Sequence, residues 1–137
     1  AMLSSSITSS RAGGSGGGAI IMFSGSSVTV NSSSIVNSSI AQTGWNGGAV
    51  NVQGGYLRMF SSTVTNASAN KFGGSITTYG GNTELHDTVF VYTEAGEQGG
   101  WLRLNGGSVS ANGCTSISAS APHGGAINIV AGSLTLV

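Results

Sequence analysis

The densest group of side chains that could do chemistry is Glu84-Leu85-His86-Asp87. Successive side chains of a strand point to opposite faces, so Glu84 and His86 would lie together on one face. A carboxylate beside an imidazole could act as an acid/base pair or bind a metal ion. The positions that align with these two residues one repeat away carry no second carboxylate: Arg58, Ser110, Phe60 and Asn112. We therefore predict solvated surface residues here, no catalytic residue, no metal site and no cofactor.

A second group combines an aromatic ring with a cation and amides. Trp101 and Arg103 follow one Gly-Gly pair, and an exposed tryptophan beside hydrogen-bonding groups is typical of a sugar-binding patch. The alternative is that Trp101 only covers a neighbouring loop. The sequence thus predicts a ligand-binding surface for glycans made of Trp101, Arg103, Asn51, Thr77 and Asn128.

Two other features concern covalent chemistry. Asn31, Asn37 and Asn66 match the N-glycosylation pattern, although such matches also arise by chance in a serine-rich chain. They matter only in a secreted eukaryotic protein. The single cysteine, Cys114, excludes an internal disulfide and a cysteine-based zinc site. We predict that Cys114 is a small residue in a packed column.

These residues belong to a repeat that begins with Gly-Gly. Its five starts lie at residues 17, 47, 73, 99 and 124, with spacings of 30, 26, 26 and 25 residues. Alternation with a period of two after each start indicates a strand with one buried face. The predicted inward pairs are Ile20/Met22, Val50/Val52, Ile76/Thr78, Leu102/Leu104 and Ile127/Ile129. The residues between them are predicted to point outward: Ile21, Asn51, Thr77, Arg103 and Asn128.

A turn and a second alternating strand follow in every repeat. Its inward pairs are Val28/Val30, Leu57/Met59, Thr83/Leu85, Val109/Ala111 and Leu134/Leu136, and a third inward column holds Ile7, Ile35, Val64, Phe90 and Ser116. Residues one repeat apart resemble each other, as expected if they lie directly above one another about 4.8 Å apart. An antiparallel sandwich gives no reason for this resemblance. The sequence therefore predicts an all-β fold, a right-handed parallel β-helix of about five coils with 25–30 residues per coil.

The same alignment predicts two ion pairs between adjacent coils. Arg58 and Glu84 are 26 residues apart in one outward column, and Lys71 and Glu97 share that offset. Exposed pairs of this kind contribute roughly 0–1 kcal/mol and would help to fix the register more than the stability.

Composition and length limit the partners. Charged residues make up 6% of the chain, against about 25% in an ordinary soluble domain, and the formal net charge is zero. Nucleic acids and anionic membranes need a basic surface, so we predict no nucleic-acid partner, and no apolar run is long enough for membrane insertion. Residues 1–137 read as a single segment that begins and ends at nearly the same phase of the coil. We expect its ends to pair with neighbouring coils of the same or an identical chain, as part of a longer repeat protein.

The Gly-Gly-Ala-Ile and Gly-Gly-Ala-Val starts at residues 17, 47 and 124 resemble the repeats of chlamydial polymorphic outer-membrane proteins and related autotransporter-type surface proteins. The motif is degenerate at 73 and 99, and the Phe-x-x-Asn motif of those repeats is poorly kept. The resemblance covers nearly the whole chain. It implies a pectin-lyase-like β-helix displayed outside the cell or on its surface.

Three functions are compatible with this pattern. The first is a non-catalytic structural or adhesive repeat segment of an extracellular or cell-surface protein, stacking into a rod or filament. The second is a carbohydrate-binding solenoid, and the third is a fragment of a carbohydrate-active enzyme. We predict the first.

Overall fold

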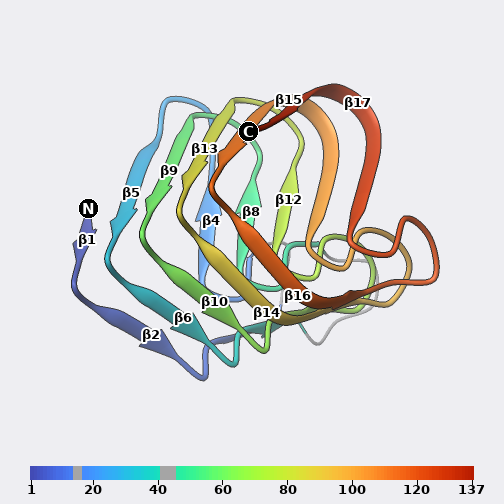
Figure 1. The fold of residues 1–137 in the computed structure, drawn as a ribbon, viewed down its shortest axis with the longest axis horizontal. Helices are drawn as coiled ribbons and strands as arrows, with labels where there is room; N and C mark the ends of the chain where they lie inside the picture. Colours follow the sequence, from blue (N-terminus) through green and yellow to red (C-terminus); the bar gives the residue numbers. More distant parts are fainter. Residues whose placement is uncertain (14–16, 41–45) are drawn as a thin grey trace.

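The chain folds as a parallel β-solenoid of about five turns (Figure 1). The computed structural model describes residues 1–13, 17–40 and 46–137. The secondary-structure elements within these ranges are all β-strands. Every strand ladder is parallel, as coil stacking requires. One nine-stranded sheet contains, in spatial order, β1 (Met2–Leu3), β5 (Ser27–Asn31), β9 (Tyr56–Phe60), β13 (Asn82–His86), β15 (Leu102–Asn112), β12 (Ile76–Thr78), β8 (Val50–Val52) and β4 (Ile20–Met22), with β17 (Ile127–Leu136) beside β15.

The second sheet has eight strands and closes the other side of each coil. In spatial order it contains β2 (Ser6–Thr8), β6 (Ser34–Val36), β10 (Thr63–Thr65), β14 (Val89–Ala95), β11 (Ser68–Ala69), β7 (Ser39–Ile40) and β3 (Arg11–Ala12), with β16 (Thr115–Ser120) beside β14. The long strands β14 and β15 pass around a corner, so each pairs with two shorter strands of the preceding coil.

The strand register confirms the predicted columns. Ile76 pairs with Val50 on one side and with Leu102 on the other. In the second strand, Glu84 pairs with Arg58 and Ser110. The inward columns form one continuous core whose largest fully buried side chains include Phe90, and the third column is buried at Ile35 and Val64.

A fourth short strand in each coil was not predicted. It comprises β3, β7, β11 and the end of β14, and it adds Ile40, Ala69 and Ala95 to the buried residues. Segments of two residues are too short for an alternating pattern to be recognised in the sequence.

The double glycine at the starts 47, 73 and 99 meets two different structural requirements. The first glycine is left-handed, with φ of +59° at Gly73 and +63° at Gly99, a conformation that side chains disfavour. The second glycine lies against the backbone of the next coil: a Cβ at Gly74 would stand 2.2 Å from the carbonyl oxygen of Gly100. Only glycine lets the coils approach this closely at the corner.

A ladder of hydroxyls stabilises the corner between the two sheets. Ser33, Ser62 and Thr88 are buried, and each hydroxyl donates to the carbonyl two residues earlier, over 2.7, 2.7 and 3.0 Å respectively. The Ser62 hydroxyl also accepts the amide N–H of Ser33, at 3.3 Å, which links adjacent coils. Cys114 takes the same position in the next coil, with Sγ 3.5 Å from the Asn112 oxygen. Burial raises the pKa of this thiol, which fits the predicted packing role.

Candidate functional site

The predicted outward column of the first strand is buried, which corrects the sequence-based interpretation. Asn51, Thr77 and Arg103 are 1%, 0% and 8% exposed, and Asn128 in the last coil is half-buried. The cause is the residue directly before each of the Gly-Gly pairs at 47, 73, 99 and 124: these residues form a ladder of parallel bridges of their own, and Thr77 and Arg103 hydrogen-bond to two of them. That covering ladder consists of Asn46, Phe72, Gln98 and His123.

Trp101 is also part of the core rather than of a surface patch. It is 5% exposed, and its ring lies 5.2 Å from that of Phe90. The aligned residues Ala49 and Ser75 are fully buried too, because this position still lies inside the corner. The predicted ligand-binding surface therefore does not exist as an exposed set, and Trp101 is not available to stack on a sugar.

Arg103 is held in place by the covering ladder. Its guanidinium carbon lies 3.7 Å from the centre of the Phe72 ring, and its Nε donates to Gln98 Oε1 at 3.1 Å. Burial raises the pKa of the nearby Tyr79 hydroxyl, and the charge of Arg103 opposes that shift. Arg103 thus interacts with side chains from three other segments of the chain: Phe72, Gln98 and Tyr79.

A polar pocket opens next to this buried column. It has a volume of about 350 Å³ and is lined by Asn46, Asn51, Gln53 and Tyr79. Asn46 Nδ2 donates to the Tyr79 hydroxyl. The side-chain oxygens of Asn46 and Asn51 are buried and have no hydrogen-bond partner among the described residues. Sequence analysis selected Asn51 but missed the other three residues, which lie outside the predicted strands.

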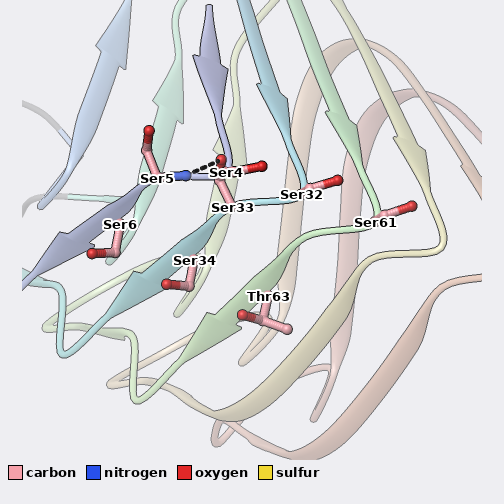
Figure 2. A pocket seen from close by; sticks show the side chains of 8 residues that line it. All are labelled: Ser4, Ser5, Ser6, Ser32, Ser33, Ser34, Ser61 and Thr63. Carbon is pink, nitrogen blue, oxygen red and sulfur yellow. Dashed lines mark hydrogen bonds between the residues drawn. The ribbon is translucent and has the colours of Figure 1, made fainter.

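A second, wider hollow lies on the corner between the sheets, and serine and threonine alone line it. Its volume is about 470 Å³. Figure 2 shows Ser4, Ser32 and Ser61 projecting in one direction from three adjacent coils, with Ser6, Ser34 and Thr63 as a second row. The lining offers hydroxyls only, with no ionisable group to activate one as a nucleophile.

The Glu84 cluster is engaged in structural contacts. As predicted, Glu84 faces Arg58 across adjacent coils, with Oε2 3.2 Å from the arginine Nε. The Tyr56 hydroxyl also donates to Glu84. His86 stacks on Phe60, with the ring centres 5.1 Å apart and the planes at 13°. In the described parts of the chain, no group of three or more His, Cys, Asp or Glu side chains could hold a metal ion.

The prediction of an ion pair between Lys71 and Glu97 is wrong. The backbone register is as expected, because the Glu97 amide donates to the Lys71 carbonyl at 2.9 Å. However, Arg58–Glu84 is the one ion pair within 4.0 Å in the described residues. The Lys71 ammonium lies instead 4.9 Å from the centre of the Phe72 ring, where the aromatic face attracts it.

The contacts of Glu84 shift the pKa of its carboxyl group, and this shift can be tested. The hydrogen bond from Tyr56, followed by that from Arg58, holds the pKa of the Glu84 carboxyl below its ordinary value. A carboxyl whose pKa is lower in the folded state than in the unfolded state stabilises the fold at pH values above the unfolded-state pKa. This contribution is lost as the pH falls through the folded-state pKa. We expect Tyr56→Phe to raise the Glu84 pKa, measured by NMR titration of its carboxyl carbon. Tyr79→Phe is the control and should leave it unchanged; equal values in wild type and Tyr56→Phe would contradict the assignment.

The three glycosylation motifs lie in different surroundings. Asn37 and Asn66 are exposed and left-handed, and Asn66 Nδ2 donates to Asn37 Oδ1 at 3.1 Å. Asn31 is half-buried and accepts a hydrogen bond from Ser32 Oγ at 3.2 Å. A glycan on Asn66 would therefore be attached to the nitrogen that makes this hydrogen bond between two coils.

Comparisons with known proteins return no match: no protein-family model, no curated protein and no solved structure corresponds to this chain. Within the described ranges, no helix is long and apolar enough to cross a membrane. The resemblance of the Gly-Gly-Ala starts to surface-protein repeats stays a hypothesis.

Proposed function

We propose that this chain is a non-catalytic structural or adhesive segment of an extracellular or cell-surface protein, working as part of a longer β-solenoid rod or filament. The observation that carries the proposal is the free strand edge at the C-terminal end of the stack. In the described chain, β17 pairs with β15 alone, and its ten residues include the exposed Ile129, Val130 and Leu136. Long strand edges with apolar side chains recruit further strands.

The core columns support the same proposal because they reach both ends. Met2 pairs with Val30, and Leu136 pairs with Ala111 at the opposite end of the same column. An added coil at either end would extend this column without changing its direction. The extracellular location and the adhesive role rest on the resemblance to surface-protein repeats.

End-to-end association tests the proposal. We expect the chain to form concentration-dependent oligomers in sedimentation velocity, and we expect Leu136→Lys to suppress them, because a charge on the terminal strand opposes strand addition. Tyr92→Lys is the matched control, since it adds the same charge at an exposed position of a middle coil. A strictly monomeric wild-type chain at high concentration, or equal suppression by both variants, would contradict the proposal.

A further inference from the structure

The outward face of the second sheet carries two parallel columns of uncharged side chains. Five strands lie side by side there, β2, β6, β10, β14 and β16 (Figure 1), and each presents the two residues that flank its inward one. We call these ten residues the outer array. Its first column holds Ser6, Ser34, Thr63, Val89 and Thr115, and its second holds Thr8, Val36, Thr65, Val91 and Ile117.

The outer array repeats regularly in two directions. Neighbouring strands lie about 4.8 Å apart, and residues two positions apart along a strand are separated by about 6.6 Å. The ladder is continuous, because Thr63 pairs with Ser34 on one side and with Val89 on the other. Both distances are close to the two repeats of the prism face of hexagonal ice. Each strand can therefore meet one row of water molecules in such a crystal.

The side chains of the outer array are also rigid. Only Ser6 and Ser34 among the ten are not branched at Cβ, and branching restricts χ1, so each γ-methyl has a defined position. The hydroxyls of Thr8, Thr63 and Thr115 belong to exposed residues and are accessible to water. A surface of fixed methyls and hydroxyls can bind ordered water with little loss of side-chain entropy.

A separate feature, the hydroxyl-lined hollow, supports ordered water at this face. The hollow of about 470 Å³ adjoins the first column, which contributes Ser6, Ser34 and Thr63 to its lining (Figure 2). A water molecule occupies about 30 Å³ in the liquid, so the hollow has room for a cluster of waters rather than a single one. Ser4 and Ser32 form a further row of hydroxyls beside it, one per coil.

The composition of the outer array argues against other occupants. It has no ionisable group for a charged ligand and no aromatic ring on which a sugar could stack. What it offers is a period in two directions, and only a crystalline surface repeats with it over all five strands.

We propose that the outer array binds ice, with its hydroxyls hydrogen-bonded to water molecules of the crystal surface and its methyls seated between them. This function goes beyond the structural role proposed above and does not depend on end-to-end association. Each additional coil would add one rank to the array, so a longer solenoid would bind the crystal over a larger area.

The experiment observes a single ice crystal in a solution of the full chain while the temperature is lowered in small steps. We expect a gap between the melting and the freezing temperature, together with crystals that are faceted on their prism faces. Fluorescently labelled protein should accumulate on those faces. Leu136→Lys, which should suppress end-to-end association, should keep the gap.

Two variants decide whether the outer array is the contact surface. Thr65→Lys places a long charged side chain in the middle of the array and should remove most of the gap. Thr29→Lys is the matched control, because it makes the same change at another half-buried threonine, on the outward face of the other sheet, and should keep the gap. If Thr65→Lys fails to fold by circular dichroism, the exposed Thr63 is changed to lysine in its place, with the same expectation.

The proposal is overturned by any of three results. One is growth of round, unfaceted crystals without a gap in the wild-type solution. Another is an equal loss of the gap in Thr65→Lys and Thr29→Lys, which would place the contact elsewhere. The third is a dimer that Thr65→Lys dissociates and Leu136→Lys does not, without any gap, which would make the outer array an interface between two copies of the chain.

Discussion

Replacing Gly74 by alanine is expected to cost about 3 kcal/mol of folding free energy or more, a large fraction of the roughly 5–15 kcal/mol that stabilises a typical domain. The added Cβ would stand 2.2 Å from the Gly100 oxygen and 2.6 Å from backbone atoms of Glu94. All of these contacts are with backbone atoms, so no side chain can move aside to relieve them, and Glu94 lies in β14, which is paired on both sides. The loss is measured by urea unfolding monitored by circular dichroism.

Gly80→Ala is the matched control for this substitution. Gly80 lies in the other glycine corner of the same coil, and a Cβ there would be 3.6 Å from its nearest neighbour, the Gln53 oxygen. An ordinary van der Waals contact of this kind predicts a change below about 1 kcal/mol. Similar losses for the two substitutions would mean that close coil approach is not what the second glycine of each start provides.

Truncation of Leu85 to alanine should cost about 2–5 kcal/mol, through lost burial and the cavity that remains. Leu85 is 0% exposed in the centre of the column that runs from Met2 to Leu136. Leu136→Ala is the control, because it makes the same chemical change in the same column where the side chain is 57% exposed. We expect the control to lose less than about 1 kcal/mol. Urea midpoints measure both, and equal losses would contradict the inward assignment of Leu85.

The columns of the solenoid could be predicted because each arises from a short sequence pattern that recurs in every coil. A buried strand face leaves a period of two, and stacking leaves a period of about one coil, so Leu57, Thr83 and Val109 identify each other in the sequence alone. The pairing of Arg58 with Glu84 follows from the same register.

The fate of the opposite face could not be predicted in the same way. Whether Asn51 or Arg103 meets water depends on a separate segment that crosses it, and the ladder positions in that segment hold Asn46, Phe72 and Gln98. Phe72 is aromatic and apolar whereas Asn46 and Gln98 carry amides, so no single residue type marks these positions as a cover. The hydrogen bonding of the covered column varies in the same way: Thr77 donates to the Phe72 carbonyl and Arg103 to the Gln98 side chain, whereas the Asn51 side-chain oxygen has no partner among the described residues.

β8, β12 and the start of β15 pair in register, and the same number of residues separates each of these strands from the next. Coils built on this spacing can therefore stack on one another in the same way. Val50, Ile76 and Leu102 are each 26 positions apart and occupy one column. Duplication of one such unit within a gene would insert a coil whose two faces already match its neighbours, and it would lengthen the solenoid by one strand spacing of about 4.8 Å. Deletion of a unit would shorten it by the same step. An insertion of one residue within a strand would instead turn every following side chain of that strand to the opposite face. A solenoid of this architecture can therefore change in length by whole coils while its cross-section stays constant.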